Sequence, residues 1–183
     1  MFLTPNKYSR PGIKLEKVEK IAVHYVGNPK STAKNNRDYF ESLKDTHARY
    51  VSAHFIIGLD GEVIQCIPLN EWSYCTNQAN GYSISIECCH PDATGKFNKA
   101  TEDSLVELCA YLCNKFGLTS DDVIRHYDVT GKQCPLWYVT HPKDYTAFKN
   151  RVKTALSTAE KPAEDSKMYY VQVGAFSSKA NAE

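Results

Sequence analysis

The residues best suited to chemistry are two histidines and a cysteine that lie far apart in the sequence. His24 follows the segment Ile21-Ala-Val, and His126 and Cys134 have the spacing His-x7-Cys. Imidazole and thiolate groups are good zinc ligands, and three protein ligands leave a fourth coordination position for water. Zinc polarises a carbonyl and lowers the pKa of its bound water to roughly 7. These residue types therefore favour a zinc hydrolase, while each histidine taken alone is equally compatible with ordinary packing.

A nucleophilic mechanism is open to some of the same residues. Cys134 with His126 would form a thiol and base pair for covalent catalysis. That arrangement leaves His24 without a role. A purely structural zinc site is a further alternative, and it predicts unfolding on chelation with no turnover.

Alternating strands and helices must position these side chains. Short runs rich in β-branched residues predict strands at 21–26, 52–58, 62–67, 83–88 and 123–124, with Asp60-Gly61 as a hairpin turn. Helical periodicity predicts helices at 33–45, 101–116 and 144–156. Thr101 is the predicted N-terminal cap of the second helix, and Gly117 is predicted to end it. The alternation indicates an α/β fold with a mixed central β-sheet flanked by helices.

Composition limits the partners of the protein. The net charge of +1 argues against a nucleic-acid partner, because phosphate binding needs a clear basic excess. The chain has no apolar run near the roughly 20 residues of a membrane span, so we expect no membrane insertion. Its seven cysteines form an odd, irregularly spaced set, which predicts reduced thiols. Cys109 and Cys113 share the apolar face of one predicted helix and should be core residues.

Two segments resemble the type 2 N-acetylmuramoyl-L-alanine amidases, a family of phage lysins and bacterial autolysins related to the peptidoglycan recognition proteins. They are Ile21-Ala-Val-His-Tyr25 and the stretch 125–135, RHYDVTGKQCP. The segment 52–65 is similar to the central hairpin of that family, and 83–87 to its next strand. The resemblance covers residues 15 to 156. It implies a zinc-bearing cleft on one face of the sheet, one Zn²⁺ per chain, and bacterial peptidoglycan as the partner.

The resemblance also assigns roles to individual residues. Glu87 occupies the position of the general base in one branch of the family, and a carboxylate there would move protons during amide hydrolysis. Another branch has tyrosine before the hairpin histidine, where this chain has Ala53. Lys132 matches a lysine that stabilises the anionic intermediate. The zinc positions of the family correspond to His24, His126 and Cys134.

The substrate is expected to lie against the loop 70–82, which is rich in aromatic and amide side chains. His54 in the hairpin is expected to support the metal site or to contact substrate. The loop residues predicted to contact the sugar or the peptide are Trp72, Tyr74, Asn77 and Asn80.

The chain divides into a catalytic domain, 1–156, a polar linker, 157–167, and a short C-terminal segment, 168–183. The last segment resembles the opening of a sporulation-related repeat, a wall-binding module. The N-terminus lacks the apolar region of a signal peptide, so we expect the protein to be made in the cytoplasm and to reach the wall by lysis-coupled or other non-classical release. The expected reaction is hydrolysis of the amide between N-acetylmuramic acid and L-alanine. The alternative is a non-catalytic peptidoglycan-binding module.

Overall fold

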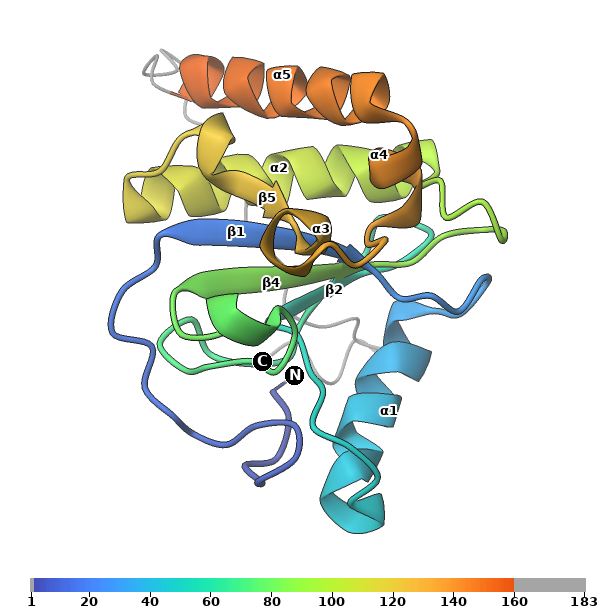
Figure 1. Ribbon diagram of the computed structural model, residues 1–183, viewed down its shortest axis with the longest axis vertical. Coiled ribbons are helices and arrows are strands. Elements are labelled where there is room, and N and C mark those ends of the chain that lie inside the picture. Colours follow the sequence, from blue (N-terminus) through green and yellow to red (C-terminus); the bar gives the residue numbers. More distant parts are fainter. Residues whose placement is uncertain (1, 160–183) are drawn as a thin grey trace, which may run out of the picture.

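The computed structural model describes residues 2–159, which are built on a five-stranded sheet (Figure 1). The strand order is β3-β2-β4-β1-β5. β1 pairs in parallel with β4 and β5, and β2 pairs in parallel with β4 but antiparallel with β3. The sheet is therefore mixed, as the sequence predicts. The strands are β1 (Lys20–Tyr25), β2 (Phe55–Ile57), β3 (Val63–Gln65), β4 (Ser83–Cys88) and β5 (Val123–Arg125).

Helices cover the sheet from two sides. Figure 1 shows α2 and α5 together along one side, with α1 on the other. Within the described residues, four short helices occupy the connections. The helices are α1 (Ala33–Thr46), η1 (Asn77–Ala79), α2 (Lys99–Phe116), η2 (Ser120–Asp122), α3 (His126–Thr130), α4 (Leu136–Thr140) and α5 (Pro142–Ala159).

Alternation along the central strands separates an apolar face from a polar one. In β4, Ile84 and Ile86 are fully buried in the main core, which also contains the inner residues of α2 and α5. Side chains alternate between the two faces of a strand, so Ser85 and Glu87 point away from that core. His24 is paired with Glu87 in the register of β1 and β4. The polar side chains of the two central strands therefore share the face that α2 and α5 leave uncovered.

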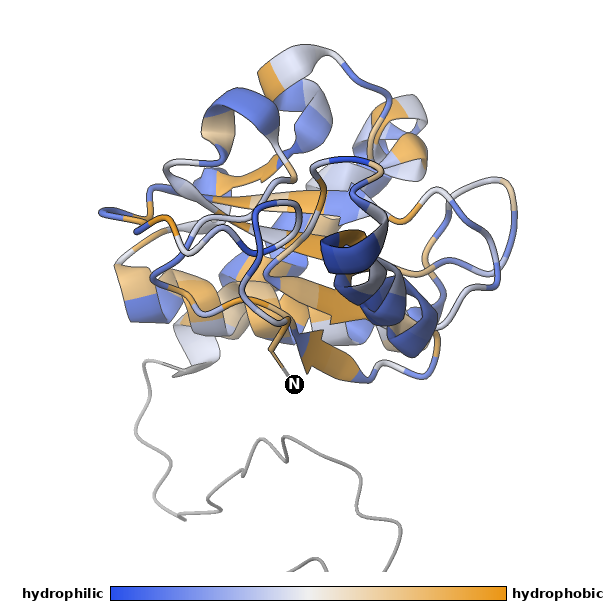
Figure 2. Cartoon of the chain, turned by 90° about the horizontal axis from the view of Figure 1, so that it is seen from below, coloured by the Kyte–Doolittle hydropathy of each residue, from blue (hydrophilic) through white to orange (hydrophobic). Residues whose placement is uncertain are grey.

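The hydropathy of the chain follows this arrangement. In Figure 2 the strands are mostly hydrophobic, whereas the helices and loops carry many hydrophilic residues. A second apolar cluster joins α1 to the sheet through Phe40 and Ile56, and it includes Leu3 from the N-terminal segment. Burial of such side chains contributes about 25 cal/mol per Å² of apolar surface removed from water.

The start of α2 differs from the expected one. Asn98 caps the helix, and its side chain accepts a hydrogen bond from the Thr101 amide at 2.9 Å. Thr101 is buried inside the first turn, where its hydroxyl donates to the Gly58 carbonyl. The prediction of Thr101 as the cap is therefore wrong, because its hydroxyl binds the β2–β3 hairpin instead. The helix ends, as expected, at Gly117, which has a φ of 66°.

The last helix continues past its predicted end. α5 runs to Ala159, so the first residues of the predicted linker are helical. The remainder of that linker and the segment 168–183, with its resemblance to a sporulation-related repeat, lie outside the described residues. Between residues 2 and 159, no helix has the length and apolar character required to cross a membrane.

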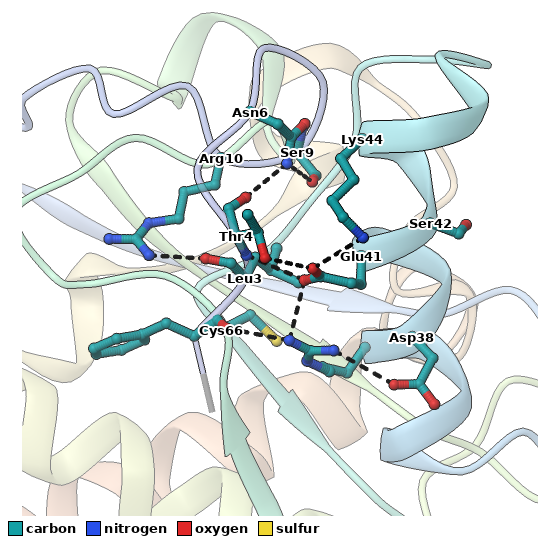
Figure 3. A network of polar contacts seen from close by, with 12 residues as sticks. Leu3, Thr4, Asn6, Ser9, Arg10, Asp38, Glu41, Ser42, Lys44 and Cys66 are labelled. Atoms are coloured by element: carbon teal, nitrogen blue, oxygen red, sulfur yellow. Dashed lines mark hydrogen bonds and ion pairs between the residues drawn. The ribbon is translucent and has the colours of Figure 1, made fainter.

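A polar network fastens the N-terminal segment to the rest of the molecule (Figure 3). Thr4 donates two hydrogen bonds to Glu41 of α1, through its amide at 3.1 Å and its hydroxyl at 2.6 Å. Arg10 donates to the Leu3 carbonyl and binds both carboxylate oxygens of Glu71. Bidentate pairs of this kind have a well-defined geometry. The network thus fixes Glu71, which begins the segment leading to the polar face of the sheet.

The cysteines are all free thiols, as the odd count predicts. Cys109 and Cys113 lie in the main core, in agreement with their position on the apolar face of α2. Cys88 belongs to the same core, whereas Cys89 belongs to the second cluster. Cys88 and Cys89 therefore point to opposite faces of the sheet and cannot bind one metal ion together.

Candidate metal centre

Three side chains that are distant in sequence meet on the polar face of the sheet. His24 comes from β1, His126 is the first residue of α3, and Cys134 follows α3. Their potential ligand atoms all lie within 4.8 Å of one another. The Cys134 Sγ is 3.6 Å from His24 Nδ1, and the two imidazole rings are 4.8 Å apart in an edge-on arrangement. The structure thus brings together the three residues that the sequence selects as metal ligands.

The segment 125–134 folds back on itself to place two of these residues. The Arg125 amide donates to the Asp128 carboxylate, which closes the first turn of α3 around His126. The Tyr127 amide donates to the Cys134 carbonyl at 3.0 Å, which brings the end of the segment back to its beginning. Local backbone contacts therefore hold His126 and Cys134 at a fixed separation.

The unsatisfied atoms at this position fit a metal ion. Both ring nitrogens of His126 are buried and have no hydrogen-bond partner in the part of the chain that the structure describes. Buried polar atoms nearly always have a partner, so an exception on a histidine calls for a ligand. Two imidazoles and a thiolate are the donors that zinc prefers. The residues present therefore fit a zinc ion with three protein ligands.

Burial sets the protonation of these groups. It lowers the pKa of His24 well below its usual value, with further lowering by His126 and Lys132. Burial, followed by the charge of Lys132, lowers the pKa of His126 to about 4. Burial also raises the pKa of the Cys134 thiol to about 12. The two imidazoles are accordingly neutral at neutral pH, the form in which histidine binds a metal.

Glu87 lies beside this cluster, because the pairing of β1 with β4 places it opposite His24. Its Oε2 atom is inaccessible to solvent and has no hydrogen-bond partner within the described residues, while Oε1 accepts a hydrogen bond from Cys75 Sγ at 3.6 Å. Burial raises the pKa of the Glu87 carboxyl to about 7, against the opposing charge of Lys132. Lys132 itself is exposed on the loop before Cys134. The site thus combines an enclosed carboxyl with a nearby cation.

The predicted substrate-contacting residues occupy different environments. Trp72 is half-buried against the main core, and Tyr74 packs edge-on against Tyr50 with ring centres 5.5 Å apart. Asn77 is exposed at the start of η1, the short helix that lies next to α3. Of these three, Asn77 belongs to the element that borders the metal cluster.

His54 and Asn80 form hydrogen bonds with the segments that surround the site. His54 is completely buried, with Nδ1 bonded to Ser85 and Nε2 2.9 Å from the Glu71 carbonyl. The Asn80 side-chain oxygen accepts from the amides of Cys75 and Thr76. Both side chains are thus engaged with the loop and strand around the site, and their contact with substrate stays a prediction.

Cys75 and Thr76 contact the centre, although the sequence does not single them out. The Thr76 Oγ1 atom is 2.9 Å from His24 Nε2. Cys75 forms a second compact group with His24 and Glu87, whose ligand atoms also lie within 4.8 Å. Both residues belong to an irregular loop without periodicity, so no local pattern distinguishes them. The polar character of the loop as a whole is the only signal that points there.

Comparison with known proteins identifies the family. The family model described as N-acetylmuramoyl-L-alanine amidase matches residues 14–137. The chain is 37% identical over 177 residues to N-acetylmuramoyl-L-alanine amidase BlyA of Bacillus subtilis (strain 168), covering 85% of this chain and 47% of that protein. It is 34% identical to N-acetylmuramoyl-L-alanine amidase CwlL of Bacillus licheniformis, covering 91% and 51%. The chain thus spans about half the length of these curated relatives.

Solved structures agree with this assignment. The structure of PlyL matches with a TM-score of 0.73 at 25% identity, covering 85% of this chain and 96% of that one. The solution structure of the PlyG catalytic domain matches with a TM-score of 0.71 at 26% identity, covering 88% and 96%. The described fold therefore corresponds to nearly the whole of these solved chains. On this sequence and structural evidence, the chain belongs to the N-acetylmuramoyl-L-alanine amidase family.

Proposed function

We propose that this chain hydrolyses the amide bond between N-acetylmuramic acid and L-alanine in bacterial peptidoglycan, with one Zn²⁺ held by His24, His126 and Cys134. The observation that carries the proposal is the buried two-histidine, one-cysteine cluster in a chain of this amidase family. BlyA and CwlL, the relatives that match most of the chain, are themselves named as amidases of this specificity.

Zinc, when bound, supplies Lewis-acid polarisation of the scissile carbonyl and activates the attacking water. The His24 and His126 rings and the Cys134 thiolate would hold it, since each directs a donor atom into the same small volume. Their burial keeps competing water away from the donors and keeps both imidazoles neutral.

Glu87 is assigned the movement of protons. Its Oε2 atom has no hydrogen-bond partner among residues 2–159 and is therefore available to accept the proton of the attacking water. The same oxygen would then deliver that proton to the departing amine of L-alanine. The contact of Oε1 with Cys75 holds the carboxyl in place during both transfers.

Lys132 is assigned the stabilisation of negative charge. Its ammonium lies close enough to lower the pKa of both His126 and Glu87, although the residue is exposed. A cation directed at an oxygen that becomes negative in the transition state has its largest effect there. Cys134 is poorly suited to nucleophilic attack, because its thiol is 2% exposed.

The test is mass spectrometry of purified peptidoglycan after digestion by the full chain, with and without a zinc chelator. Chelator-sensitive release of intact stem peptides with a free N-terminal alanine is the expected result. Cleavage within the stem peptide would replace the bond assignment with a peptidase activity. Binding of peptidoglycan without any product, in zinc-loaded protein, would favour the non-catalytic alternative.

A further inference from the structure

The loop from Cys75 to Asn80 reaches the site from outside the sheet. It carries the short helix η1, which lies next to α3, and it precedes β4. Two consecutive residues, Cys75 and Thr76, direct their side chains to different parts of the centre. Cys75 contacts Glu87, and Thr76 contacts His24.

Thr76 fixes the orientation of one predicted metal ligand. Its side chain is completely buried, and Oγ1 lies 2.9 Å from His24 Nε2. The other ring nitrogen, Nδ1, is the one near Cys134 Sγ. With Nε2–H donating to the threonine hydroxyl, Nδ1 keeps its lone pair for a metal. Contacts of this kind to the distal nitrogen of a ligating histidine set its tautomer and ring orientation.

Cys75 acts on the carboxyl of Glu87. The thiol is a weak hydrogen-bond donor, and its Sγ lies 3.6 Å from Glu87 Oε1. Because Oε2 has no partner among the residues that the structure describes, this contact distinguishes the two oxygens of the carboxyl. It restricts the rotation of the carboxyl group, which lies in one compact group with His24 and Cys75.

Asn80 couples these two contacts. Its side-chain oxygen accepts from the amides of Cys75, at 3.1 Å, and Thr76, at 2.7 Å. A single acceptor therefore fixes the backbone at both residues. The Ala79 amide closes the loop by donating to the Thr76 carbonyl at 3.0 Å.

We propose that the loop Cys75–Asn80 positions the centre: Thr76 orients His24 for the metal, Cys75 orients Glu87 for proton transfer, and Asn80 holds both in place. The inference rests on the proposed function, and it assigns separate consequences to two adjacent residues. Thr76 acts on metal affinity, whereas Cys75 acts on turnover.

The experiment compares Thr76→Val, Thr76→Ser, Cys75→Ala and Cys75→Ser with the unaltered chain. Zinc affinity is measured by competition with a chromophoric chelator, and kcat and KM by release of N-terminal alanine from peptidoglycan. Gln78→Ala, at an exposed position of the same loop, is the matched control. Thermal unfolding in excess chelator reports whether each variant is folded independently of zinc.

Thr76→Val should raise the zinc dissociation constant about 10- to 100-fold, the usual effect of losing such a contact. Thr76→Ser should restore it to within about threefold. Cys75→Ala should lower kcat about tenfold with unchanged KM and zinc affinity, because a small misplacement of a reacting group has a large effect on rate. Cys75→Ser should recover most of that loss. Asn80→Ala should impair both zinc affinity and kcat.

Equal zinc affinities for the threonine variants and equal kcat values for the cysteine variants would overturn the proposal. A folded Thr76→Ser variant separates this result from simple misfolding of Thr76→Val. Failure of the unaltered chain to bind zinc or to cleave peptidoglycan would instead contradict the proposed function, so the two failures are distinguishable.

Discussion

Replacement of Glu87 by glutamine is the sharpest test of the proposed chemistry. Glutamine has nearly the same shape, and its amide oxygen can still accept the contact from Cys75 that Oε1 now makes. The amide nitrogen would replace Oε2, which has no hydrogen-bond partner to lose between residues 2 and 159. The change therefore removes the ability to accept and return a proton while leaving the packing of β4 intact.

The expected loss of catalytic rate follows from the loss of proton transfer by Glu87. General acid–base catalysis contributes roughly 10²- to 10⁴-fold. At about 1.36 kcal/mol per tenfold, this corresponds to an increase of about 2.7–5.4 kcal/mol in the activation free energy. The loss should appear in kcat, with little change in KM, because Glu87 acts on the reacting atoms rather than on the ground-state complex.

The assay is release of N-terminal alanine from purified peptidoglycan at saturating zinc, with zinc content measured on the same samples. Glu107→Gln removes an exposed carboxylate from α2, on the other side of the sheet, and serves as the control. A Glu87→Gln variant that binds zinc and retains kcat within threefold would refute the role of Glu87. Loss of zinc from the variant would show instead that the carboxylate supports the metal.

Three further outcomes are expected. Chelation of the metal should abolish cleavage of peptidoglycan. Zinc at about 100 times its dissociation constant should raise the free energy of unfolding by about 2.7 kcal/mol, which corresponds to roughly 5–10 °C in Tm. An unchanged Tm in calorimetry would argue against a bound metal. Lys132→Met should lower kcat about 10²- to 10³-fold in the alanine-release assay, and Lys132→Arg less, if the cation meets the anionic oxygen. Equal losses for both substitutions would point to a steric role. Leu112→Ala, at a fully buried position of α2, should lower the free energy of unfolding by about 2–5 kcal/mol in urea. Tyr111→Ala, next to it but 55% exposed, should change it by less than about 1 kcal/mol, and a similar loss at both would contradict the assigned core.

The elements that the sequence predicts well are those whose hydrophobic pattern is long and regular. The strand predicted at 83–88 coincides with β4, because isoleucine alternates with polar residues at the two-residue period of a strand. The short helices α3 and α4 are not predicted, because five residues are too few to show helical periodicity. Long-range contacts stabilise them, such as the bond from Arg125 to the Tyr138 carbonyl.

The candidate site was predictable where residue chemistry is distinctive. Histidine and cysteine side chains suggest a metal site. The resemblance of the surrounding segments to the amidase family predicts that His24, His126 and Cys134 lie together. Thr76 gives no such signal, since its contact with His24 joins residues 52 positions apart. His54 and Asn80 show a different difficulty of reading a site from sequence. A polar side chain that satisfies a loop backbone looks the same in sequence as one that binds a ligand.

The pairing of β1 with β4 has a consequence for when activity arises during folding. His24 and Glu87 face each other only in one register, and a slip of one residue would turn Glu87 to the opposite face of the sheet. Cys134 must also arrive from 110 positions away in the sequence. Parallel, non-local pairing of this kind forms late, because long loops must close first. A partly folded chain would accordingly have neither the zinc affinity nor the hydrolytic power of the finished sheet.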